Sequence, residues 1–286
     1  MKKNISIQAA VFFIGCSLAG YQAMTQPYLD VVNGKYSNSP SAGMLNQDKN
    51  DVKLQYSGVH TNIPVQFRNK KDALIFSPYY EKWWVQVTTG NVQGYSGIGL
   101  PVSFIKTLPS SKWGFLLNGI LRMNDSTISK KNNVQAGGAL VVTYKNRETL
   151  TWKLGLYMNN ELFGLFVIPL AGIDWRINGT NNLFGILPGN LTYEHKVNRH
   201  FYYGACFRAI TNSYGKAGGY WRIDENQLGF YADAYLTNHL VLNAEAGHSL
   251  IRKMRNGVKN TVKTDLRVND GVYFRLSLAY RVRFTQ

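Results

Sequence analysis

Between Val272 and Phe284 the chain alternates strictly between two kinds of residue. One set is apolar or aromatic (Val272, Phe274, Leu276, Leu278, Tyr280, Val282 and Phe284), and the set between them is Tyr273, Arg275, Ser277, Ala279, Arg281 and Arg283. Side chains alternate faces along a β-strand, so the stretch predicts a strand with one apolar and one mainly polar face, whereas a helix would mix both sets. The stretch also exceeds the roughly 9–11 residues that a tilted strand needs to cross a bilayer. It is therefore predicted to be the closing strand of an outer-membrane β-barrel.

The same alternation recurs along most of the chain. Short turns are predicted at residues 69–72, 109–111, 146–148, 198–199 and 237–239, and the connections between them are longer and more polar, including a long charged loop at 251–271. Short turns on one rim and longer loops on the other are typical of transmembrane barrels. The fold class is therefore predicted to be all-β, an antiparallel transmembrane β-barrel of about 12 strands. Counts of about 10 and about 14 stay open, because the first segment and the Pro188–Gly189 segment each allow two interpretations.

The N-terminus has the organisation of a secretory signal peptide. Lys2 and Lys3 supply the positive charge, and the apolar run Ile5–Ala19 is too short to cross a membrane as a helix. Cleavage is expected after Ala19, with Ala23 as the weaker alternative.

Three regions follow from this interpretation. They are the signal peptide at 1–19, with cleavage as late as 23, a polar lead-in segment and loop at 20–50, and one barrel domain at 51–286. A lipobox-like sequence that ends at Cys16 leaves open a lipid-anchored N-terminus.

Composition limits the classes of function. The formal net charge is +16, and the mean hydropathy of −0.21 excludes a bundle of membrane helices but not a barrel, because half of each barrel strand is polar. The basic residues do not form a nucleic-acid recognition motif, so no nucleic-acid partner is predicted. The predicted location is the bacterial outer membrane, and the predicted partners are its lipids and the anionic lipopolysaccharide.

Strand parity predicts which charged side chains face the lumen. The candidates are Glu81, Lys153, Asp174, Arg176, Glu194, Arg208, Asp233, Glu245, Arg275 and Arg281. They either form a salt-bridge network that fills the interior, since unpaired buried charge is costly, or line a narrow selective pathway. A barrel of about 12 strands lies between the filled barrels of about 8 and the open channels of about 16–18. A filled or narrowly gated interior is the expectation we favour.

Two local features carry further expectations. Glycines at inward positions, among them Gly229 and Gly247, predict room for a bulky neighbouring side chain. Trp83 and Trp84 stand at a predicted strand end, where the aromatic belt of a membrane interface would lie.

No pattern in the sequence supports catalysis or cofactor binding. There is no nucleotide-binding glycine motif and no His set with metal-ligand spacing, so no catalytic residue, cofactor or metal is predicted. A membrane-embedded lipid-modifying hydrolase stays open as an alternative, but it needs Ser and His on one outward face, and the neighbours His248 and Ser249 point to opposite faces. A secreted soluble β-protein that binds anionic glycans is the other alternative, and it would be soluble without detergent.

Three segments carry a family resemblance. Phe76–Glu81, Leu170–Ile177 and the final strand that ends at Phe284 resemble Bacteroidota outer-membrane β-barrel proteins, and they are most similar to an uncharacterised barrel family of unknown function. The resemblance implies insertion by a barrel-assembly machinery that reads the C-terminal strand, although here Thr285 and Gln286 follow the aromatic residue. The function we expect is that of a non-enzymatic outer-membrane barrel: a narrow pore, a small-ligand uptake protein or a structural barrel.

Overall fold

The computed structural model describes residues 26–44, 47–69, 72–87, 90–108, 112–126 and 133–284. The predicted signal peptide, with its cleavage alternatives and Cys16, lies outside these residues. Within the described ranges, no helix is both long enough and apolar enough to cross a membrane.

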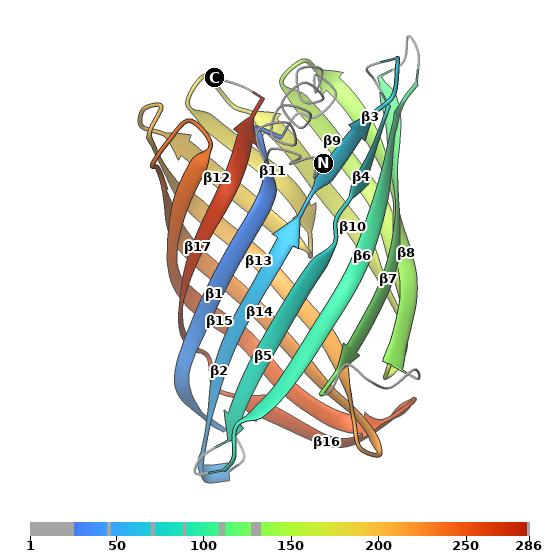
Figure 1. Ribbon diagram of the computed structural model, residues 1–286, viewed down its shortest axis with the longest axis vertical. Helices are drawn as coiled ribbons and strands as arrows, with labels where there is room; N and C mark the ends of the chain where they lie inside the picture. Colours follow the sequence, from blue (N-terminus) through green and yellow to red (C-terminus); the bar gives the residue numbers. More distant parts are fainter. Residues whose placement is uncertain are drawn as a thin grey trace, which may run out of the picture.

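Strands make up nearly all of the described chain, and they form one closed sheet (Figure 1). They are β1 (Tyr28–Met44), β2 (Gln47–Thr61), β3 (Ile63–Gln66), β4 (Ala73–Phe76), β5 (Tyr79–Val87), β6 (Gln93–Thr107), β7 (Trp113–Asp125), β8 (Val134–Arg147), β9 (Leu150–Glu161), β10 (Gly164–Arg176), β11 (Asn181–Leu187), β12 (Asn190–Lys196), β13 (Phe201–Lys216), β14 (Gly219–Tyr235), β15 (Leu240–Val258), β16 (Thr261–Val268) and β17 (Gly271–Arg283).

Three pairs of these segments are consecutive parts of single wall strands, which gives a barrel of 14 strands. β2 pairs with β5 while β3 pairs with β4, and β15 pairs with both β16 and β17 along its length. The expected number of about 12 strands was therefore too low, although 14 was among the open alternatives. The two additional strands are β1 and one arm of the β11–β12 hairpin, which turns at Pro188–Gly189.

The barrel closes between its first and last strands. β17 pairs with β1 from Tyr28↔Arg283 to Asn38↔Phe274, and the other edge of β1 pairs with β2, all antiparallel. β17 is thus the closing strand, as its alternation predicted. The expectation of a polar lead-in segment and loop at 20–50 was wrong for residues 28–44. The outward face of β1 carries Gly34 and Asn38 besides Val32 and Tyr36, so its alternation is too weak to be recognised in the sequence.

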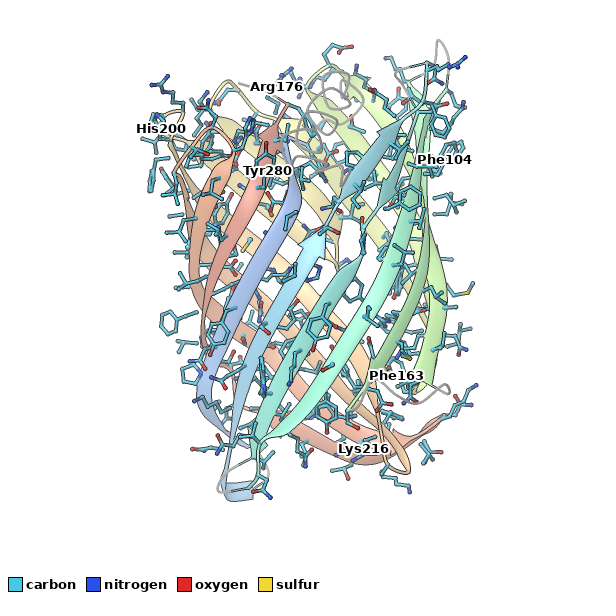
Figure 2. The ribbon with its side chains drawn as sticks, in the orientation of Figure 1. Phe104, Phe163, Arg176, His200, Lys216 and Tyr280 are labelled. Carbon is cyan, nitrogen blue, oxygen red and sulfur yellow. The ribbon has the colours of Figure 1, made fainter. Side chains whose placement is uncertain are left out.

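The two faces of the wall differ as the alternation requires. On β17 the residues Val272, Phe274, Leu276, Leu278 and Tyr280 are 37–57% exposed on the outside, whereas the alternate residues Tyr273–Arg281 are buried inside. Figure 2 shows Phe104 on β6 at the outer margin of the barrel. A closed wall satisfies its backbone groups between neighbouring strands, and an apolar exterior suits hydrocarbon, so this is the organisation of a transmembrane β-barrel.

Two rims are distinguished by the chain ends. We call the rim where the described chain begins and ends the terminal rim, which is uppermost in Figure 1; there the Phe284 amide donates to the Pro27 carbonyl over 3.0 Å. The predicted turns at 146–148, 198–199 and 237–239 lie on this rim. The opposite rim, lowermost in Figure 1, is called the far rim.

Two neighbouring wall strands, β11 and β12, are too short to span the full height of the barrel. β11 and β12 have 7 residues each, whereas their neighbours β10 and β13 have 13 and 16. Their pairing with those neighbours ends at Ala171↔Leu187 and Asn190↔Arg208. The remaining part of β10, Gly164–Leu170, pairs with β9 on its other edge only. A gap in the sheet therefore separates the far-rim parts of β10 and β13.

The predicted long charged loop at 251–271 is wrong. β15 continues to Val258, and β16 returns after a two-residue turn, so that these strands lie across the far rim in Figure 1. On β16, Lys263, Asp265 and Arg267 alternate with Thr264, Leu266 and Val268, and Leu266 and Val268 pack against the interior cluster that contains Met254. The many charged residues of the stretch had favoured a loop.

Candidate functional site in the barrel interior

A cavity of about 750 Å³ lies inside the barrel, and we call it the central cavity. Its lining has two parts. The charged part consists of Asp30, Lys35, Glu81, Arg122, Arg208, Glu245, Arg275 and Arg281, and the main apolar part consists of Phe166, Ile168, Leu170, Phe184, Pro188 and Ile210. A volume within roughly 300–1,000 Å³, lined by apolar side chains with a few convergent polar groups, is typical of small-ligand sites.

The predicted lumen-facing residues fall into three groups. Glu81, Arg208, Glu245, Arg275 and Arg281 line the central cavity, and Lys153, Asp174, Glu194 and Asp233 are buried elsewhere in the interior. Arg176 does not face the lumen: it is exposed at the terminal rim, where β10 ends and its side chain extends beyond the wall (Figure 2).

Buried ion pairs occupy the terminal side of the interior. Arg281 donates to Asp30 and to Asp233, each over 2.5 Å, and its guanidinium lies 3.7 Å from the centre of the Tyr28 ring. Arg283 pairs with Glu194 and lies 3.7 Å from the centre of the Tyr202 ring. Every charge in this group has a partner, as burial requires.

A second ionic cluster is centred on Glu245. Its carboxylate accepts two hydrogen bonds from Arg208, over 2.5 and 2.9 Å, and one from the Tyr273 hydroxyl over 2.5 Å. Arg275 approaches the same carboxylate to 3.4 Å and donates to Gln227 over 2.7 Å. One carboxylate therefore holds two guanidinium groups in the middle of the barrel.

Two glycines make room for Tyr273, as their inward positions predicted. The ring of Tyr273 is fully buried against Gly229 and Gly247, and a Cβ at position 247 would lie 2.7 Å from its Cε1 atom. A Cβ at position 229 would overlap the hydroxyl oxygen. Glycine at both positions thus allows Tyr273 to reach Glu245.

Replacing Gly247 with Ala is expected to destabilise the barrel by about 1–3 kcal/mol, since the added methyl overlaps Tyr273 and the backbone of Leu228. The measurement is the midpoint of heat-induced unfolding in detergent micelles, followed by the shift in gel mobility. Gly34→Ala is the matched control, because a Cβ at position 34 meets no atom within 4 Å. Equal midpoints for both variants would contradict the proposed contact.

An aromatic cluster fills the far side of the interior. Tyr95 and Trp221 stack at 4.4 Å between ring centres, and Tyr56, Trp83 and Tyr214 pack around them. The predicted place of Trp83 in an interfacial belt was wrong: it is buried in this cluster at 4% exposure. Trp83 is at an inward position of β5, and an aromatic side chain at an inward position packs in the lumen even when it stands near a strand end.

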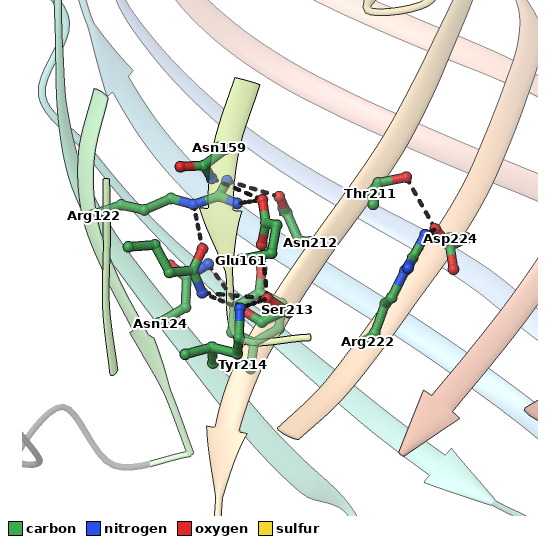
Figure 3. Close-up of polar contacts among 12 residues, drawn as sticks. Arg122, Asn124, Asn159, Glu161, Thr211, Asn212, Ser213, Tyr214, Arg222 and Asp224 are labelled. Atoms are coloured by element: carbon green, nitrogen blue, oxygen red, sulfur yellow. Dashed lines mark hydrogen bonds and ion pairs between the residues drawn. The ribbon is translucent and has the colours of Figure 1, made fainter. Parts of the chain in front are cut away.

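The far end of β13 lies inside the barrel wall (Figure 3). The Ser213 hydroxyl on β13 donates to Glu161 on β9 over 2.7 Å. The backbone carbonyl of Ser213 accepts from Asn124 on β7 and from Gln135 on β8. Ser213 and Tyr214 point to opposite faces, yet both are fully buried. The hairpin of β13 and β14 therefore covers the lumen at the far rim.

Arg122 fixes this covered arrangement. It donates to Gln135 over 2.6 Å and to Asn212 over 3.1 Å, and it pairs with the buried carboxylate of Glu161 (Figure 3). The interior is thus filled on the far side and hollow at the level of the central cavity. A filled interior describes the far side, and a charged hollow describes the middle of the barrel.

Two charged groups in the central cavity have no ionic partner in the described part of the chain. Among the described residues, Lys35 takes part in none of the ion pairs, and Glu81 accepts from Tyr214 over 2.6 Å and from Asn212 over 3.3 Å but pairs with no cation. A ligand with a charged group would find Lys35 available.

The sequence missed several residues of the site. Asp30 and Lys35 belong to the segment that was interpreted as a lead-in, and Glu161 stands at the very end of its strand. Arg122 could have been predicted from the sequence, because it lies at an inward position on a strand with clear alternation. The pattern of alternation alone does not tell which inward charges meet.

Ser249 and His248 do not form a nucleophile–base pair. The Ser249 hydroxyl is buried and donates to Glu225 over 2.5 Å, whereas His248 is exposed on the outer face. In the described part of the chain, no group of three or more His, Cys, Asp or Glu side chains could hold a metal ion.

Comparison with known proteins finds likeness in structure but not in sequence. No protein-family model matches the chain, and no curated protein matches it. Among solved structures, the NanC porin shares 9% identity over 88% of this chain and 98% of that chain, with a TM-score of 0.37. The KdgM porin shares 10% identity over 87% of this chain and 98% of that chain, with a TM-score of 0.36. A mutant of the TodX monoaromatic hydrocarbon channel shares 11% identity over 87% of this chain and 89% of that chain, with a TM-score of 0.38. Likeness at this level transfers no ligand, and the barrel architecture rests on the strand pairing described above.

Proposed function

We propose that this protein is an outer-membrane β-barrel that binds a small ligand in the central cavity and passes it through a narrow, gated route. The observation that carries the proposal is the hollow of about 750 Å³, with charged and apolar walls, inside a barrel whose far side is filled. A barrel with a purely structural role has no need of such a hollow, and Lys35 inside it, which forms no ion pair with another described residue, favours a ligand.

The location and partners are part of the same proposal. The apolar exterior and the exported character of the N-terminal sequence support an outer-membrane location in a Gram-negative cell. The terminal rim, with its short turns, would then face the periplasm. We further propose insertion by the barrel-assembly machinery, contact with lipopolysaccharide, and kinship with the Bacteroidota barrel family that the sequence resembles. The role proposed is transport without catalysis.

A narrow, gated route predicts low conductance in a planar bilayer, because the aromatic cluster blocks the far side. Replacing Trp221 and Tyr95 with Ala should raise the steady conductance several-fold, since it removes the stacked pair. Loss of two large aromatic side chains also costs stability, by about 3–5 kcal/mol for each, so heat-modifiable gel mobility must first show a folded barrel.

Phe230→Ala is the matched control, because this side chain is 75% exposed on the outer face. A wide, steady conductance of the unaltered protein would contradict the gated route. Conductance that stays unchanged in the folded double variant would contradict the assigned block.

A further inference from the structure

The gap in the wall between β10 and β13 has four defined edges, and we call it the window. Gly164–Leu170 forms one side, the β13 residues Ala209–Asn212 form the other, and the Pro188–Gly189 turn closes it toward the terminal rim. The last contact of that turn with β13 is the Ala209 amide, which donates to the carbonyls of Pro188 and Gly189, each over 3.1 Å.

Side chains close the window toward the far rim. The Arg222 guanidinium on β14 lies 3.9 Å from the centre of the Phe163 ring in the β9–β10 turn. The Asn260 amide in the β15–β16 turn donates to the Phe163 carbonyl over 3.1 Å. The gap is therefore a bounded opening in the wall rather than an open notch in the rim.

The central cavity reaches the window. Its lining includes both residues of the Pro188–Gly189 turn, and on β13 it includes Ala209 and Thr211 as well as Ile210 and Asn212. These four residues are also the β13 side of the window, and Phe166, Ile168 and Leu170 of its β10 side line the cavity too. The cavity therefore extends to both sides of the window.

The window opens toward the membrane. On the β10 side the outward residues Leu165 and Val167 are 67% and 45% exposed, as on neighbouring wall strands that face hydrocarbon. The inward residues of the same segment, Phe166, Ile168 and Leu170, are apolar too and line the cavity. This is the one part of β10 where both faces are apolar, which a wall strand beside an aqueous lumen does not need.

The cavity changes character with distance from the window. Apolar side chains of β10 line it at the opening, and charged groups of both signs line it beyond. The arginines there are paired with carboxylates, so Lys35 on β1 is the cation of this lining that has no ion pair among the described residues. An apolar body would lie along β10, and an anionic head would reach the Lys35 ammonium.

We infer that the window is a lateral entrance through which a single-chain amphiphile with an anionic head passes between the membrane and the central cavity. This inference rests on the proposed function and adds the route and the class of ligand. The carboxylate of the amphiphile pairs with Lys35, while its hydrocarbon chain packs against Phe166, Ile168 and Leu170.

The route is tested by closing the window after folding. In a Cys206→Ser background, which removes the thiol that lines the cavity, Ala209→Cys is reacted in lipid nanodiscs with a bulky methanethiosulfonate reagent. Ala205→Cys is the matched control, because it lies four residues away on the same strand, at the same outward parity, but does not line the cavity. The probe is a dansyl-labelled undecanoate added through the lipid, and its fluorescence on entering the cavity gives the rate.

The expected result is that the label at position 209 slows probe entry at least about tenfold, that the label at 205 does not, and that a reductant restores the rate. Equal entry rates for the two labelled variants would overturn the lateral route. Because the label is added after folding and is removable, a misfolded variant cannot imitate this result.

The head group is tested by Lys35→Met. Affinity for the dansyl undecanoate should fall about ten- to hundredfold, whereas affinity for the corresponding neutral amide should stay unchanged. An equal loss for acid and amide, or no loss, would overturn the assignment of the head group. If the aromatic variants conduct but no probe binds, the inference fails and the proposed function stands; if neither is seen, both fail.

Discussion

Replacement of Glu245 by Ala should lower the stability of the barrel by about 3–5 kcal/mol, because it leaves the buried guanidinium of Arg275 and the half-buried guanidinium of Arg208 without their carboxylate. Arg208 and Arg275 both depend on this residue, and Tyr273 loses its hydrogen-bond acceptor as well. The Glu245 side chain is 3% exposed, so water cannot replace it readily. The measurement is the midpoint of thermal unfolding in micelles, followed by gel mobility and tryptophan fluorescence.

Glu148→Ala is the control for this prediction. Glu148 also pairs with a cation, Lys145, but its side chain is 85% exposed in a turn, and surface pairs contribute about 0–1 kcal/mol. Glu245→Gln should fall between the two, since it keeps the shape and one acceptor oxygen but removes the charge. A midpoint for Glu245→Ala close to that of Glu148→Ala would show that the cluster does not hold the middle of the barrel together.

Replacement of Arg281 by Met should weaken the closure of the barrel, again at about 3–5 kcal/mol, by leaving two carboxylates unpaired. Arg281 on β17 joins Asp30 on β1 and Asp233 on β14, and the first two are 251 positions apart in the sequence. The seam between β1 and β17 should therefore become the least protected part of the sheet. Hydrogen exchange of the β1 amides is the measurement, because it reports opening of this seam directly.

Two further variants sharpen this test. Arg176→Met removes an exposed arginine at the terminal rim and should leave exchange unchanged. Adding Asp30→Asn and Asp233→Asn to Arg281→Met should recover much of the loss, because neutral groups replace the stranded charges. If β1 exchanges no faster in Arg281→Met than in Arg176→Met, strand pairing alone closes the barrel.

Much of the wall could be predicted from the sequence. A strand with hydrocarbon on one side and a polar interior on the other must alternate, so segments such as Val272–Phe284 identify both their conformation and their buried face. The same reasoning placed Glu245 and Arg281 inside. It failed at Arg176, since parity does not show where a strand leaves the wall.

Strands without a continuous apolar outer face were not predicted. β1 is a wall strand with a mixed outer face, the far end of β13 lies inside the wall, and the far parts of β15 and β16 lie across the far rim. Trp83 carried an ambiguous signal, because an aromatic residue at a strand end suits both an interface and a filled interior.

The sequence by itself determined an antiparallel transmembrane barrel, its closing strand and most of its inward charges, because the contrast between hydrocarbon and interior imposes a two-residue period on each wall strand. Only the tertiary structure decided which charges meet, that β13 folds inside the wall, and that a short hairpin leaves a window beside an apolar strand. These features depend on contacts between residues far apart in the chain, such as Ser213 with Glu161 and Arg281 with Asp30, and no local pattern records them.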